Sequence, residues 1–65
     1  MKTYQIRDFP ELLKVAREAA AKRPELKEEI ADHVYMARDE ANDGGSKAHE
    51  EESAIHSIKE LLGEE

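Results

Sequence analysis

Residues 24–42, PELKEEIADHVYMARDEAN, contain apolar residues that recur with the period of an α-helix. They follow the spacing i, i+4, i+8, i+11 and i+15 and comprise Leu26, Ile30, Val34, Ala37 and Ala41. A stripe of this kind lies along one side of a helix and is typical of a helix that packs against others. Pro24 suits the first turn, and the glycines that follow Asp43 suit the end. We therefore predict an amphipathic helix over residues 24–42.

Two further helices are predicted on either side of this one. The first covers residues 9–22, where Asp8 is a candidate N-cap, and its apolar face consists of Phe9, Leu12, Leu13, Ala16, Ala19 and Ala20. The other covers residues 47–62 after the candidate N-cap Ser46. We expect Ala48, Ile55, Ile58 and Leu62 to point inward, with Ala54 and Leu61 at the margin. Short connections between amphipathic helices predict an all-α fold, a small antiparallel three-helix bundle.

The start of the chain and its overall composition add further expectations. Tyr4 and Ile6 alternate with polar residues, which predicts a short extended N-terminal arm or a strand. A chain of 65 residues forms a single domain with a small core, so we expect no enclosed active site, no catalytic residues and no cofactor. The lack of cysteine excludes disulfides and fits the cytoplasm. The longest apolar run, three alanines, is too short to cross a membrane.

The net charge of −6 is distributed unevenly along the chain. Residues 1–23 contain three acidic and six basic residues, a balance of +3. Residues 24–65 contain the other 13 acidic residues and four basic ones, a balance of −9. The acidity is therefore regional, and it points to the second half of the chain as the place to look for a binding surface.

The helix predicted over residues 24–42 carries an acidic face. At about 100° per residue, seven carboxylates fall within an arc of about 120° away from the apolar stripe, and only Met36 interrupts them. The basic residues Lys27 and Arg38 fall on another side, so we expect no base of this helix to neutralise the face. The predicted partner-binding residues are Glu25, Glu28, Glu29, Asp32, Met36, Asp39, Glu40 and Asp43.

The spacing of these carboxylates destabilises their own helix. Glu25 and Glu29 are four residues apart, as are Asp39 and Asp43, and like charges at this spacing destabilise a helix. The last of them lie where the helix dipole favours cations. The first predicted helix instead places bases four residues before and after Glu18. The contrast indicates a binding role, and the alternative is a solvated face that serves solubility.

An acidic face repels phosphate and attracts basic protein surfaces, so we expect a protein partner and no direct nucleic-acid binding. The face spans about 27 Å at 1.5 Å per residue, and the third helix extends it through Glu50, Glu51, Glu52 and Glu60. By its size, its lack of cysteine and its carboxylates from Glu25 to Asp43, the chain resembles small acidic proteins of phages and other mobile elements, including anti-CRISPR proteins that mimic DNA. The resemblance implies an inhibitor that occupies the basic surface of a nucleic-acid-binding complex.

Two other hypotheses remain open. One is a helical adaptor or antitoxin-like protein that binds through an apolar patch of Tyr4, Ile6, Tyr35 and Met36. The other is calcium binding by residues 39–50, which match an EF-hand loop at Asp39, Asp43, Gly44 and Glu50. The match is degenerate, because Ala41 offers no side-chain oxygen at the third position and Lys47 places a cation at the ninth.

Histidines on the third predicted helix suggest one more metal arrangement. His49, Glu52, His56 and Glu60 follow one another at spacings of three and four residues, as in a divalent-metal clip. Side chains on one helix face cannot surround a zinc ion. We therefore interpret His49 and His56, and also His33 at the edge of the acidic face, as ordinary surface histidines. No metal site is predicted.

Overall fold

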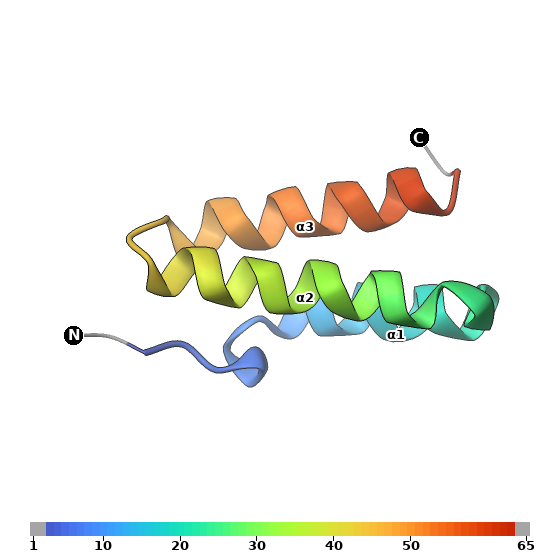
Figure 1. Cartoon of the computed structure of the whole chain (residues 1–65), viewed down its shortest axis with the longest axis horizontal. Coiled ribbons are helices and arrows are strands. Elements are labelled where there is room, and N and C mark those ends of the chain that lie inside the picture. The colour runs from blue at the N-terminus through green and yellow to red at the C-terminus, as the bar shows by residue number, and fades with distance from the viewer. Residues whose placement is uncertain (1–2, 64–65) are drawn as a thin grey trace.

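The computed structural model describes residues 3–63 and shows three helices that pack side by side (Figure 1). The elements are η1 (Ile6–Asp8), α1 (Pro10–Lys22), η2 (Pro24–Leu26), α2 (Lys27–Asn42) and α3 (Lys47–Leu61), where η denotes a 3₁₀ helix. α2 runs antiparallel to α1 and α3, and each of the three contacts the other two. The predicted all-α three-helix bundle is confirmed. Lys2, which was counted with the basic N-terminal segment, lies outside the described residues.

The start of α1 differs from the prediction. The Asp8 carboxylate does not cap α1, because it accepts a hydrogen bond from the Gln5 N–H at 2.8 Å and closes η1 instead. Phe9 occupies the N-cap position and offers no side-chain acceptor. The N–H of Leu12 therefore donates to Oε2 of Glu51, on α3, at 3.2 Å. A carboxylate from another helix thus satisfies one of the N–H groups that α1 leaves without a partner at its own end.

Three helix boundaries shift slightly from the predicted ones, and the first of them is the start of α1, at Pro10 instead of residue 9. The first turn predicted for the second helix is the separate element η2, because the Leu26 N–H donates to the Arg23 carbonyl at 2.9 Å. A bond over three residues closes a 3₁₀ turn rather than an α turn. α3 ends at Leu61, and Leu62 is its C-cap residue. The three helices otherwise keep their predicted extents.

The turn between α2 and α3 has the predicted glycine cap. Gly44 has a φ of 99°, in the left-handed region that favours glycine. The Gly45 N–H donates to the Glu40 carbonyl at 2.9 Å, which completes a Schellman cap on α2. The Ser46 hydroxyl then accepts a hydrogen bond from the His49 N–H and caps α3 as predicted. The two helices are therefore joined by a short, well-defined reversal.

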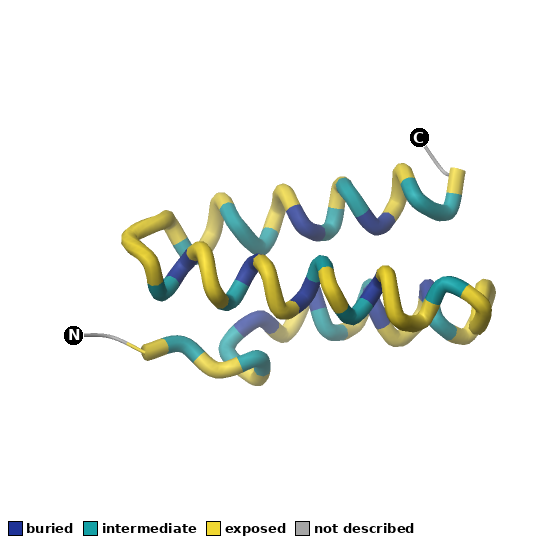
Figure 2. Tube along the Cα trace, in the orientation of Figure 1, coloured by how far each residue is buried: buried dark blue, intermediate teal, exposed yellow. Residues whose placement is uncertain are grey.

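A small core lies between the helices (Figure 2). Among residues 3–63, the buried apolar residues are Phe9, Leu12, Ala16, Ala19, Ile30, Val34, Ala37, Ala41, Ala54 and Ile58. The stripe predicted for the second helix is confirmed except at Leu26, which is half-buried in η2. α3 is rotated from its predicted position, so that Ala54 is buried and Ala48 is exposed.

The rotation of α3 has a cause at the start of α1. The Lys47 ammonium lies 5.1 Å from the centre of the Phe9 ring, and it also lies 3.9 Å from the Glu51 carboxylate. Glu51 in turn accepts the Leu12 hydrogen bond. Because Lys47 and Glu51 face α1 one turn apart, Ala48 points to solvent. Glu51, expected to extend the acidic field, instead holds α1 and α3 together.

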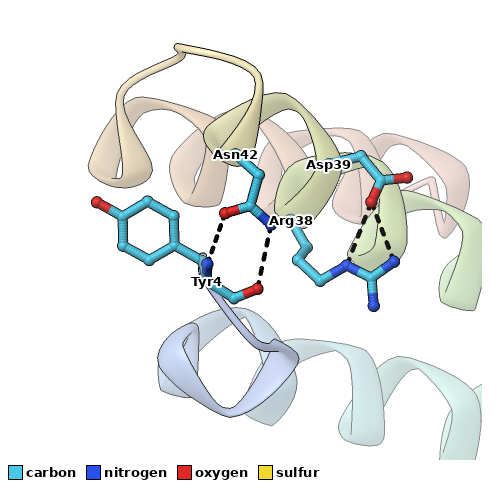
Figure 3. Close-up of polar contacts among 4 residues, drawn as sticks. All are labelled: Tyr4, Arg38, Asp39 and Asn42. Atoms are coloured by element: carbon cyan, nitrogen blue, oxygen red, sulfur yellow. Dashed lines mark hydrogen bonds and ion pairs between the residues drawn. The ribbon is translucent and has the colours of Figure 1, made fainter. Parts of the chain in front are cut away.

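The N-terminal arm is docked on the C-terminal end of α2 (Figure 3). The Tyr4 N–H donates to Oδ1 of Asn42 at 2.5 Å, and Nδ2 of Asn42 donates to the Tyr4 carbonyl at 3.2 Å. The Tyr4 ring meets the Phe9 ring edge-on, with 6.1 Å between the centroids. Residues 3–63 contain no strand. One asparagine supplies the donor and the acceptor that a neighbouring strand would have offered, so the arm is short, extended and followed by η1.

The described part of the chain measures 36 × 19 × 16 Å, and its two ends lie at opposite ends of the long axis (Figure 1). Within it, no helix has both the length and the apolar character that a bilayer crossing requires.

Candidate functional site

The eight predicted partner-binding residues, which we call the acidic face, are all exposed. Glu25 belongs to η2, Asp43 is the C-cap residue of α2, and the other six lie within α2. Met36, the one apolar member, exposes 55% of its surface. The buried residues of α2 follow the complementary helical positions. The periodicity of a single helix therefore accounts for the exposure of the whole face.

Within residues 3–63, two carboxylates of the acidic face have a basic partner. Arg23 lies 2.6 Å from Glu25, and Arg38 donates from Nε and Nη2 to Oδ1 of Asp39 at 3.2 and 3.0 Å (Figure 3). The expectation that no base of the helix neutralises the face is therefore wrong at Asp39, because the long Arg38 side chain reaches round to its neighbour. The hydrogen bond from Arg23 lowers the pKa of Glu25. Both pairs are exposed and so contribute little to stability.

The other carboxylates of the acidic face have no ion pair within residues 3–63. They are Glu28, Glu29, Asp32, Glu40 and Asp43. Glu40 meets a second carboxyl group instead of a base. A hydrogen bond with Glu50 of α3, together with repulsion between the two carboxylates, raises the pKa of Glu40. The fold therefore brings two carboxyl groups together beside the turn between α2 and α3.

The approach of Glu50 to Glu40 depends on the tight turn between their helices. A Cβ atom added to Gly45 would lie 2.8 Å from the Glu40 carbonyl oxygen and 2.9 Å from Oε2 of Glu50. Glycine leaves this space open, so the Glu50 carboxylate can lie over the turn. From the sequence, Glu50 was expected only to extend the acidic face. Its contact with Glu40 could not be predicted, because that contact requires the geometry of the turn.

The turn does not have the geometry of an EF-hand loop. Asp39 and the three residues after it belong to α2, and only residues 43–46 connect the two helices. In a calcium loop the first ligands come from non-helical backbone that wraps around one centre. His56 forms an exposed pair with Glu60 at 2.8 Å. Residues 3–63 place no three His, Asp or Glu side chains together around a metal position. The structure thus argues against the calcium hypothesis.

The four residues of the predicted apolar patch do not meet. Tyr4 packs on the core within the arm, and Met36 shares a hollow with Glu50 on the α3 side of α2. Ile6 and Tyr35 line a different hollow, between α1 and α2. Tyr35 exposes 46% of its surface there. The patch is therefore divided, and only its Ile6–Tyr35 part belongs to one concave surface.

Sequence reasoning missed this second surface, which we call the α1–α2 groove. It has a volume of about 220 Å³ and is lined by Ile6, Leu13, Ala16, Arg17, Ala20, Lys27, Ile30, Ala31, Val34 and Tyr35. None of these residues belongs to α3. The available signal was the excess of basic residues in the first 23 positions, but the groove forms only when α1 and α2 pack.

Comparisons of the chain with protein-family models, with curated protein sequences and with solved structures find no match.

Proposed function

We propose that the protein is a stoichiometric inhibitor that occupies the basic, nucleic-acid-binding surface of a partner protein. In this proposal the acidic face takes the place of nucleic-acid phosphates, as in the DNA-mimic proteins of mobile elements. The protein acts in the cytoplasm by binding and not by catalysis. The observation that carries the proposal is the row of exposed carboxylates on α2, most of which have no basic partner within residues 3–63.

The arrangement of these carboxylates is the main support. Acidic side chains also favour solubility, but solubility alone does not require like charges at positions that oppose folding. The acidic face retains like charges four residues apart and brings Glu40 against Glu50, so that the pKa of Glu40 is raised. Each of these contacts opposes folding of an isolated helix or bundle. A cationic partner would offset that repulsion on binding. The arrangement therefore favours a binding role for the acidic face.

The dimensions of the face also suit a groove that accommodates nucleic acid. From Glu25 to Asp43 the face extends about 27 Å at 1.5 Å per residue. A DNA duplex presents one phosphate about every 1.7 Å of its axis, so seven carboxylates match some of the phosphates in one duplex turn. The bundle is only 19 × 16 Å in cross-section and can enter a long basic groove. The expected contacts are lysine and arginine side chains of the partner.

The test is capture of a nucleic-acid-binding complex that duplex DNA can displace. The immobilised full chain is incubated with nuclease-treated host lysate, and the bound proteins are eluted with duplex DNA or with a salt gradient. We expect both to release the same complex, because attraction between exposed charges is screened by salt. The variant Glu29→Lys/Asp32→Lys should lose capture while keeping its helical circular dichroism, since both side chains are exposed and neither has an ion pair within residues 3–63.

The matched control is Glu11→Lys/Glu18→Lys on α1, where both residues are exposed. Each double variant replaces two acids by two bases and so moves the net charge from −6 by four, to about −2. We expect the α1 control to retain capture. If both variants keep their helical circular dichroism and lose capture equally, net charge alone explains the binding. If neither does, the acidic face is not the binding surface.

A further inference from the structure

We propose that the α1–α2 groove is a second binding surface, which takes an amphipathic helix whose apolar stripe is flanked by acidic residues. This inference does not rest on the proposed function, because the groove and the acidic face share no residue. It would make the protein two-sided, with a basic partner on one surface and an acidic helical partner on the other.

The lining of the groove has the periodicity of two helix faces that lie side by side, one on α1 and one on α2. On α1 its residues are at positions 13, 16, 17 and 20, and from the start of α2 they are at 27, 30, 31, 34 and 35. Spacings of three and four residues lie along one side of a helix. The groove therefore runs lengthwise between α1 and α2 over two turns, about 10 Å at 1.5 Å per residue. A helical segment of two to three turns matches this shape.

The groove lies on the side of the α1–α2 pair opposite to α3. Two packed helices leave one long depression on each side, and α3 contacts both α1 and α2 in the other depression. In the open depression Ala16, Ala20 and Ala31 provide small side chains, which let another helix approach closely. A helix bound here would complete a four-helix arrangement. Tyr35, 46% exposed, would lie against it as an aromatic anchor.

The charge around the groove selects an acidic occupant. Two hollows adjoin the groove through the shared residues Ile6, Leu13 and Arg17. Five of the nine basic residues in the described part of the chain line these three hollows, namely Arg7, Lys14, Arg17, Lys27 and Arg38. Of the residues between positions 3 and 63 that line these hollows, Glu18 is the one acidic residue. Apart from Arg38, these bases have no ion pair within residues 3–63.

A second copy of this chain does not fit the same description. Its exposed large apolar residues within positions 3–63 are Tyr35 and Met36, and Tyr35 belongs to the groove itself. One methionine among carboxylates gives no apolar stripe that could fill a two-turn depression. The occupant is therefore a different chain, recognised in the helix-in-groove mode by apolar residues at i, i+3, i+4 and i+7.

The test uses a phage-displayed library of random 16-residue peptides selected on the full chain at physiological salt. We expect enriched peptides with a helical apolar stripe and flanking Asp or Glu. Amide chemical-shift changes on binding should centre on Arg17, Ala20, Lys27 and Tyr35. Lys27→Glu should weaken binding of these peptides about tenfold or more, because an attractive charge becomes a repulsive one.

The matched control is Lys59→Glu, an exposed residue of α3 outside the groove with the same change of charge. It should leave peptide affinity within about twofold, as expected for long-range charge effects that salt screens. The proposal is overturned if no peptides are enriched, if they carry Lys or Arg and shift the acidic face, or if both variants weaken binding equally. It is also overturned if the groove shifts arise from self-association in sedimentation, or if anionic vesicles bind the groove in a Lys27-dependent way while peptides do not.

Discussion

The acidic face and the α1–α2 groove both use α2, yet they differ in charge, shape and origin. The acidic face is exposed and belongs to one helix and the residues at its ends. The groove is concave, mostly apolar and bordered by bases, and it needs two helices. A net charge of −6 describes neither surface. The partners of a small bundle are therefore better inferred from its individual helix faces than from its total charge.

The two surfaces also differ in what maintains them. The acidic face requires only that α2 be helical, because exposed positions follow from helical periodicity. The groove requires that α1, α2 and the arm keep their relative positions, because Ile6 of η1 completes its lining. Perturbations of the packing between α1, α2 and the arm should therefore affect the groove more than the acidic face.

The largest expected effect comes from the core that both surfaces share. Ile58 is fully buried, and Ile58→Ala should lower the free energy of unfolding by about 2–5 kcal/mol. A bundle of this size has only a small stability reserve, so most molecules of the variant should be unfolded near physiological temperature. Both binding activities should therefore fall together. Thermal unfolding followed by circular dichroism measures the loss.

Ile55→Ala on the same helix is the matched control for this prediction. Ile55 is half-buried, so the same chemical change should produce a clearly smaller loss. Equal destabilisation by the two variants would contradict the position of the core. If Ile58→Ala kept one surface functional and abolished the other, the two surfaces would not depend on one folded unit.

An intermediate effect is expected at the docked arm. Asn42→Ala removes both hydrogen bonds to Tyr4, which together should lower the free energy of unfolding by about 1–2 kcal/mol. Release of the arm would also withdraw Ile6 from the groove, so groove peptides should bind more weakly while capture through the acidic face persists. Hydrogen exchange of the Tyr4 amide should accelerate in the variant. Unchanged protection of that amide would show that Asn42 does not hold the arm.

The smallest effect is expected at the paired carboxyl groups, and it depends on pH. The raised pKa of Glu40 means that the folded chain binds this proton at a higher pH than the unfolded chain. The associated stability is fully present below the unfolded value of about 4.5 and is lost as the pH rises through the raised folded pKa. Glu40→Gln should therefore raise the melting temperature at pH 7 and change it little at pH 4.

Glu29→Gln is the control for this pH dependence, because Glu29 has no ion pair within residues 3–63. The difference in melting temperature between each variant and the parent chain, measured at both pH values, isolates the contribution of one carboxyl group. Equal gains at pH 7 would mean that the whole face repels itself diffusely. A gain confined to Glu40→Gln would place the repulsion at the contact with Glu50.

Much of the fold and all positions of the acidic face could be predicted from the sequence. The stripe from Ile30 to Ala41, the Gly44 cap and the Ser46 cap depend on residues a few positions apart, whose geometry a helix determines locally. The rotation of α3 was not predictable in this way. Ala48 and Ala54 fit the helical pattern almost equally well, and only the contacts of Lys47 and Glu51 with the start of α1 distinguish them.

The three helices and the solvent-facing positions of the carboxylates were therefore predictable, because helical periodicity is a property of neighbouring residues. The contacts between those helices depend on how they pack. Glu51 caps α1 across 39 residues, and Asn42 holds Tyr4 across 38. The contact of Glu40 with Glu50 and the groove between α1 and α2 likewise arise between elements. These features depend on the distances and rotations of packed helices, which the core sets and no local pattern encodes.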